Sequence, residues 1–174
     1  VSAASGYAML TPSVVEQKPG DVGAYHELNA AQRAMMLGEG QENMPVPEVK
    51  ACTKEDIEWV KQKFLDAARR CVEAGVDGIE IHGSHGYLFD SFLNPRYNKR
   101  ADEYGGSVEN RARFLTETVA LIKKHYGNKL AIMVKLTSVE MLTDNGITNE
   151  DAIEVAKLLE KAGADAICCS SYAP

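Results

Sequence analysis

The chain has 174 residues, 45% hydrophobic and 25% charged, which is the composition of an ordinary globular protein in water. Its net charge of −6, without a basic block, argues against a nucleic-acid partner, and no apolar run approaches the ~20 residues that span a membrane. Cys52, Cys71, Cys168 and Cys169 form neither a CxxC pair nor a zinc spacing. No signal peptide is visible, so we expect reduced thiols in a cytoplasmic protein.

The first 52 residues are rich in glycine and proline and show little hydrophobic periodicity. Only Ala24 to Leu37 has the pattern of a short helix. An N-terminal segment of this length with little regular structure is uncommon in a compact domain. It indicates a functional loop or a segment separated from its neighbours. We therefore predict a loop-rich lead over residues 1–52 and regular structure over residues 53–174.

From residue 53 the chain repeats one pattern three times: an amphipathic helix, a glycine and a short apolar strand. Thr53 and Asp56 have the spacing of a capping box, Gly75 stops the first helix, and Val76–His82 is typical of a strand. The next two units have the helix starts Ser107 and Asn149, the stops Gly127 and Gly163, and the strands Ala131–Thr137 and Ala166–Ser170. In the third helix we expect the inward residues to be Ile153, Ala156, Leu158 and Leu159.

The two faces of the predicted strands differ in polarity. In the first strand Ile79 and Ile81 share one face, while Glu80 and His82 share the other, and Lys135 lies on the mixed face of the second strand. A sheet covered by helices on both sides should be apolar on both faces, whereas a barrel is aliphatic outside and polar near its mouth. The sequence therefore predicts an α/β fold, a partial (β/α)8 barrel of three to four βα units with strands missing at both ends.

Polar side chains crowd the end of the first predicted strand, where His82, His85 and Tyr87 fall within six positions. Two imidazole N–H groups that converge on one oxygen could hold a carbonyl and stabilise negative charge on it. A tyrosine with an ordinary pKa of ~10 is protonated at neutral pH and can act as a general acid. The residues alone leave two alternatives open, ordinary surface histidines beside a packed tyrosine, or a zinc site that still lacks a third ligand.

Lys135 is a cation on the inward face of an otherwise apolar strand. A buried ammonium needs a partner, and Glu80 on the preceding strand could supply it. The lysine could equally face an anionic ligand or the edge of a cofactor. Further along, the polar loop from Asn94 to Gly106 carries charges that we expect to be solvated and partly paired, and its Gly105-Gly106 step is typical of a tight turn into the next helix.

Residues 73–114, which read EAGVDGIEIHGSHGYLFDSFLNPRYNKRADEYGGSVENRARF, closely resemble a segment shared by the Old Yellow Enzyme family of NADH:flavin oxidoreductases. The most similar branch contains bacterial 2,4-dienoyl-CoA reductases and enoate reductases, and looser similarity runs from Thr53 to Ser171. The resemblance implies that residues 1–174 are a piece of one FMN-binding barrel domain. It also implies that the remaining strands, and any iron–sulfur cluster, lie outside this chain.

The resemblance implies a role for each site residue. His82 and His85 match the pair that binds the activating oxygen of an unsaturated carbonyl substrate above the flavin, and Tyr87 matches the tyrosine that protonates the α-carbon. Lys135 stands where the family usually has an arginine on the flavin pyrimidine edge, so the charge is kept and the bidentate fork is lost. Lys135 and His82 are thus the expected flavin contacts, and no metal site is implied.

We therefore predict an NAD(P)H:flavin oxidoreductase of the ene-reductase type, with FMN as cofactor and a small unsaturated carbonyl compound as substrate. The 174-residue chain by itself is expected to bind FMN weakly or not at all and to be inactive. Two other functions stay open, a non-catalytic partial barrel that assembles with complementary chains, and a barrel lyase or metal hydrolase that uses the HxxH pair. A homo-oligomer and the choice between NADH and NADPH are also left open.

Overall fold

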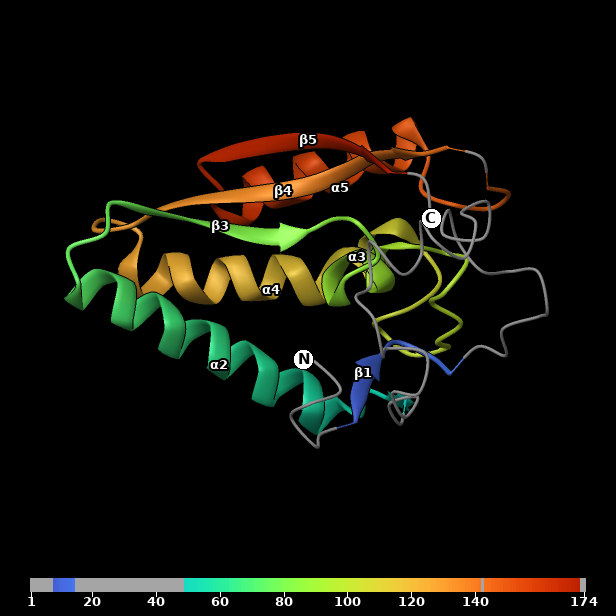
Figure 1. Cartoon of the computed structure of the whole chain (residues 1–174), viewed down its shortest axis with the longest axis horizontal. Coiled ribbons are helices and arrows are strands. Elements are labelled where there is room, and N and C mark those ends of the chain that lie inside the picture. Colours follow the sequence, from blue (N-terminus) through green and yellow to red (C-terminus); the bar gives the residue numbers. More distant parts are fainter. Residues whose placement is uncertain (1–7, 15–48, 142, 173–174) are drawn as a thin grey trace, which may run out of the picture.

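The computed structural model describes residues 8–14, 49–141 and 143–172 of the chain (Figure 1). The helix predicted over Ala24–Leu37 lies outside the described residues. In chain order the elements are β1 (Met9–Thr11), β2 (Val49–Ala51), α2 (Lys54–Glu73), β3 (Gly78–Gly83), α3 (Leu88–Leu93), α4 (Val108–Tyr126), β4 (Ala131–Glu140), α5 (Asn149–Ala162) and β5 (Ala166–Tyr172).

The long helices begin where side chains cap their first amides. The Thr53 hydroxyl accepts a hydrogen bond from the Asp56 amide, and the Asp56 carboxylate accepts one from the Thr53 amide, so α2 opens with the predicted capping box. Ser107 caps α4 and Thr148 caps α5 through the same hydroxyl contact. Gly75 follows α2 with a left-handed φ of 74°, a conformation that ends helices.

The strands β3, β4 and β5 form one parallel sheet in that order, while β1 and β2 pair with each other in a separate parallel sheet of two strands. Within the main sheet, His82 lies opposite Lys135, and Lys135 lies opposite Cys168. Helices α2, α4 and α5 run beside the strands, and the strands share one direction (Figure 1). This arrangement confirms the predicted α/β architecture, a portion of a (β/α)8 barrel.

The side of the sheet that faces the helices holds the core. Ile81, Ile132 and Val134 are fully buried there. Phe114 on α4 packs edge-on against Phe92 of α3, with ring centroids 5.0 Å apart. Burying such side chains stabilises a fold by roughly 1.5–3 kcal/mol each, so this face supplies most of the stability.

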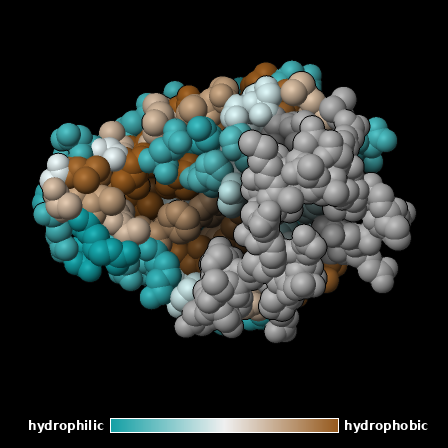
Figure 2. Space-filling view, viewed as in Figure 1, coloured by the Kyte–Doolittle hydropathy of each residue, from teal (hydrophilic) through white to brown (hydrophobic). Residues whose placement is uncertain are grey.

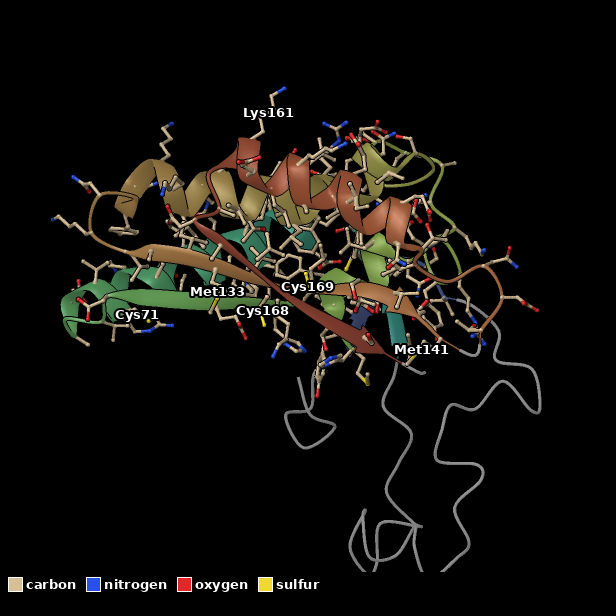
Figure 3. All side chains as sticks on the ribbon, turned by 90° about the horizontal axis from the view of Figure 1, so that it is seen from above. Cys71, Met133, Met141, Lys161, Cys168 and Cys169 are labelled. Atoms are coloured by element: carbon tan, nitrogen blue, oxygen red, sulfur yellow. The ribbon has the colours of Figure 1, made fainter. Side chains whose placement is uncertain are left out.

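The opposite face of the sheet is much more accessible to solvent. Met133 and Cys168 lie toward this side in Figure 3, away from α5, and Glu80 on β3 is also exposed. Figure 2 shows hydrophobic residues gathered between the sheet and α2, with hydrophilic residues of α2 along the border. In a closed barrel the accessible face would line the interior, which explains its mixture of polar and apolar side chains.

The structure corrects two expectations about the segments outside the strands. The polar loop of residues 94–106 directly follows the short helix α3 (Leu88–Leu93). Its charges are partly paired as predicted, since Arg100 pairs with Asp102, but the loop is not simply solvated, because Asn94 and Asn98 are buried. The Asn98 amide donates to the backbone carbonyls of Phe92 and Tyr104, so a buried polar network holds the loop.

Helix α5 faces the core with most of the predicted residues. Leu159 is fully buried, and Ala156 and Leu158 are partly buried against the core. Ile153 was also expected to face inward, but it is 57% exposed. Ala152 and Val155, which were not predicted, are buried instead and continue the row from Leu159 at helical spacing. None of the described helices is long and apolar enough to cross a membrane.

Candidate active site

The candidate site lies at the carboxyl ends of the three parallel strands. His82 is the penultimate residue of β3, Lys135 is its register partner on β4, and Ser170 lies near the end of β5. Parallel strands place their carboxyl ends at one edge of the sheet, and α3 follows β3 directly at this edge (Figure 1). The fold thus brings side chains more than eighty positions apart in sequence to one edge, where barrel enzymes build their sites.

The three predicted catalytic side chains are brought together. The His82 ring lies 4.8 Å from the Tyr87 ring and 5.4 Å from the His85 ring, measured between centroids, and both pairs meet edge-on. Tyr87 is 64% exposed, so its phenol faces outward from the strand end. The rings of His85 and Tyr87 therefore both contact the His82 ring.

His82 has a buried ring nitrogen without a hydrogen-bond partner among the described residues. This atom is Nε2, and the whole side chain is half-buried. Burial lowers the pKa of His82, and the nearby His85 and Lys135 lower it further. The imidazole is therefore neutral at pH 7, and its Nε2–H tautomer would present a donor that no protein group satisfies.

His85 is held from two sides by hydroxyl groups. Its Nε2 shares a hydrogen bond of 2.6 Å with Ser170 Oγ, and its amide donates to Thr137 Oγ1 at 3.3 Å. Thr137 Oγ1 also lies 3.0 Å from Ser84 Oγ, and both of these side chains are fully buried. No role was predicted for these three hydroxyl residues. The signal that could have found them is their place at or just beyond the carboxyl ends of the strands.

Lys135 meets Glu80 across the sheet, as one of the sequence alternatives predicted. Lys135 Nζ lies 3.7 Å from Glu80 Oε1, and both side chains are about a third exposed. Such a long and partly solvated pair contributes at most about 1 kcal/mol. An ammonium has three donor hydrogens, so Lys135 can keep this contact and still meet an anionic group on the inner face.

Metal ligands are not gathered at this edge. Across residues 8–14, 49–141 and 143–172, no group of three or more His, Cys, Asp or Glu side chains could hold a metal ion. The cysteines Cys52, Cys71, Cys168 and Cys169 are all free thiols.

A surface depression of about 300 Å³ lies at the other end of the strands, near Gly78, Ala131 and Ala166, and none of the predicted catalytic residues lines it.

Comparison with known proteins gives a consistent family. Residues 13–174 match the model of the NADH:flavin oxidoreductase / NADH oxidase family. The NADPH dehydrogenase of Bacillus subtilis is 39% identical over 178 residues, which cover 97% of this chain and 50% of that protein. The NADH oxidase of Thermoanaerobacter brockii is 43% identical over 119 residues, which cover 68% of this chain and 18% of that protein.

A solved structure supports the barrel assignment. The Old Yellow Enzyme homologue from Zymomonas mobilis superposes with a TM-score of 0.72 at 26% identity, covering 96% of this chain and 43% of that one. The chain thus spans half or less of the length of each of these three proteins. Its parallel strands and helices correspond to a portion of that homologue's fold, which confirms the predicted partial barrel.

Proposed function

Because this chain belongs to the NADH:flavin oxidoreductase / NADH oxidase family, we propose that its protein is an FMN-dependent NAD(P)H oxidoreductase that reduces the C=C bond of an α,β-unsaturated carbonyl compound. The observation that carries the proposal is the convergence of His82, His85 and Tyr87 at the end of β3. The Nε2 atom of His82, which has no partner in the described part of the chain, is the kind of donor that a substrate oxygen would satisfy.

The residues on the inner face suit a flavin. Lys135 presents a cation there in register with His82, and electron-rich flavin edges are anionic or strongly polar. Lys135 and His82 would therefore contact the isoalloxazine, although a lysine makes a single point contact where an arginine would make two. When bound, FMN supplies the hydride for the substrate β-carbon after receiving it from NAD(P)H.

The histidine pair would bind the carbonyl oxygen of the substrate. Hydrogen bonds from His82 and His85 polarise the conjugated C=C bond and stabilise negative charge that develops on the oxygen as hydride arrives. The neutral state of His82 suits this role, because a neutral ring donates a hydrogen bond without giving its proton away. His85 contacts Ser170 through Nε2 in this structure, and binding a substrate at that nitrogen would replace or share this contact.

Tyr87 would complete the reaction by protonating the α-carbon. Its phenol is exposed on the open side of the histidine pair, where a substrate held by the histidines would extend. With one hydride on the β-carbon and one proton on the α-carbon, the product is the saturated carbonyl compound. The bacterial 2,4-dienoyl-CoA and enoate reductase branch is the finer assignment that we propose from the motif of residues 73–114. The two relatives named above are an NADPH dehydrogenase and an NADH oxidase.

The test is the visible spectrum of the full-length protein. We expect a flavin spectrum that bleaches when NADPH or NADH is added without oxygen and returns when 2-cyclohexenone is added, with cyclohexanone as the product. A colourless protein, or a reduced flavin that the enone does not reoxidise, would contradict the proposal. We expect the 174-residue chain alone to carry no stoichiometric flavin, and finding a full equivalent would overturn that part.

A further inference from the structure

The turn that joins the two histidines to the tyrosine has an unusual backbone. His85 has a φ of 58° and Gly86 a φ of 74°, so two successive residues are left-handed. Glycine adopts this conformation freely, but a histidine does so at a cost. Such a turn persists only where its surroundings hold it. Because His85 lies inside it and Tyr87 follows it directly, the turn determines where both side chains lie relative to His82.

Two side chains from different elements hold successive amides of this turn. From β4, Thr137 Oγ1 accepts a hydrogen bond from the His85 amide at 3.3 Å. From the first turn of α3, Asp90 Oδ2 accepts one from the Gly86 amide at 2.9 Å. Asp90 therefore reaches back past Tyr87, the N-cap residue of α3, and binds the residue before it. An acid at this helix position more commonly binds the amide of the N-cap itself.

The carboxyl group of Asp90 is in an unfavourable place for mere capping. The side chain is fully buried, and its Oδ1 has no hydrogen-bond partner among the described residues. Burial raises the pKa of Asp90 to about 6, and the negative Glu140 on β4 raises it too, against hydrogen bonding from Thr137 and Gly86 that lowers it. A neutral capping group or an apolar side chain would avoid this cost.

We propose that Asp90 is a positioning residue that holds the left-handed His85–Gly86 turn and thereby places His85 and Tyr87 around His82. This inference rests on the proposed function for its kinetic consequences. Its structural consequence does not, because the Gly86 contact exists whatever the substrate is. Asp90 itself touches neither substrate nor flavin in this account, so its removal acts through the two residues on either side of Gly86.

The experiment compares three variants of the full-length flavoprotein. Asp90→Leu keeps the number and branching of the side-chain heavy atoms but removes the acceptor for the Gly86 amide, whereas Asp90→Asn keeps an acceptor at the same reach. Glu154→Gln is the matched control, because Glu154 lies on α5 in a partly exposed pair with Lys157, 3.6 Å apart. The two readouts are the imidazole NMR signals of ¹⁵N-labelled histidine and the two half-reactions of the flavin.

We expect Asp90→Leu to move the His85 and His82 imidazole signals and to lower kcat/KM for 2-cyclohexenone about 10- to 100-fold, as misplaced catalytic groups do. Flavin reduction by NAD(P)H should stay unchanged, and Asp90→Asn and Glu154→Gln should behave like the wild type. If Asp90→Leu does not fold, Asp90→Ser replaces it, since a serine is too short to reach the Gly86 amide.

Unmoved histidine signals and an unchanged kcat/KM in the folded variant would show that Asp90 only caps α3, and would overturn the proposal. Equal loss in both half-reactions would overturn it as well, because that pattern reports a general loss of structure. If the wild type reduces no enone, the proposed function is wrong. The histidine NMR signals of Asp90→Leu then test the positioning role of Asp90 without the activity measurement.

Discussion

The helix-covered face of the β3–β4–β5 sheet and the carboxyl edge of the same sheet differ in how well their buried groups are satisfied. On the helix-covered face Ile81, Ile132 and Val134 are buried among other apolar groups, and each contact there favours folding. At the carboxyl edge, His82 Nε2 and Asp90 Oδ1 are buried and have no hydrogen-bond partner within residues 8–14, 49–141 and 143–172. A structure selected for stability alone would satisfy both atoms. The difference indicates that the helix-covered face supplies the stability. The edge arranges reactive groups, and its unsatisfied polar atoms lower the stability of the fold.

The largest stability effect should come from the helix-covered face. Phe114→Ala removes a fully buried ring that packs against Phe89 at 4.7 Å and Phe92 at 5.0 Å. We expect the free energy of unfolding of the full-length protein to fall by about 3–5 kcal/mol in urea titrations. The control Ile153→Ala, on the exposed side of α5, should change it by less than about 0.5 kcal/mol. Equal losses in the two variants would contradict the assignment of the core.

The edge should respond in the opposite way, with a large effect on catalysis and little on stability. His82→Ala removes a donor to the proposed carbonyl oxygen, so kcat/KM for an unsaturated carbonyl should fall about 10²–10³-fold. Thermal unfolding should change little, because His82 Nε2 has no partner to lose among the described residues. His125→Ala, at an exposed histidine of α4, is the control and should leave both quantities unchanged. A His82→Ala enzyme with wild-type kcat/KM would refute the role.

The free-energy cost of burying the Asp90 carboxyl group should appear as a pH-dependent difference in stability between Asp90→Asn and the wild type. The carboxyl group titrates near pH ~3.9 in the unfolded chain, and burial raises its pKa to about 6 in the folded one. The folded state therefore binds more protons between these values, and wild-type stability falls as pH rises from ~4 to ~6. The variant lacks this loss, so its stability relative to the wild type should rise across that interval and level off above pH ~7, reaching about 3 kcal/mol. Urea titrations that give a difference independent of pH would contradict the burial cost.

The smallest effect concerns the start of α2. Thr53→Ala removes the hydroxyl that accepts from the Asp56 amide, which is one half of the capping box, and leaves the backbone half in place. The free energy of unfolding should fall by about 1 kcal/mol with no change in enone reduction. Thr53→Ser retains the hydroxyl and should behave like the wild type. A loss of activity in Thr53→Ala at unchanged stability would contradict the prediction that the start of α2 contributes to stability and not to enone reduction.

The features that could be predicted from the sequence depend on neighbouring residues. Thr53, Asp56 and Gly75 define the ends of α2 through local hydrogen bonds and backbone preference, and alternation along β3 is enough to separate Ile81 from His82. The convergence of His82, His85 and Tyr87 follows from the same strand end. All of these are short-range consequences of residue type and spacing.

The features that could not be predicted depend on distant partners. Thr137 and Ser170 hold His85 across 52 and 85 positions. The charges of the loop after α3 were expected to be solvated and partly paired. Arg100 does pair with Asp102, but its side chain also donates to the Cys52 carbonyl 48 positions away, a contact that local sequence does not predict. Asp90 carried no local sign of burial, because a short helix with one acid also suits a surface. These contacts exist only once the strands are assembled.

Tyr87 is proposed to give a proton to a substrate held by the histidine pair, and the two flavin half-reactions of Tyr87→Phe test this role. The substitution removes only a hydroxyl from a largely exposed ring, so the fold and flavin binding should persist. Stopped-flow spectra of the full-length protein should show flavin reduction by NAD(P)H at the wild-type rate. Reoxidation by 2-cyclohexenone should be about 10²–10⁴-fold slower. Equal rates of reoxidation in the variant and the wild type, or equal slowing of both half-reactions, would contradict the account.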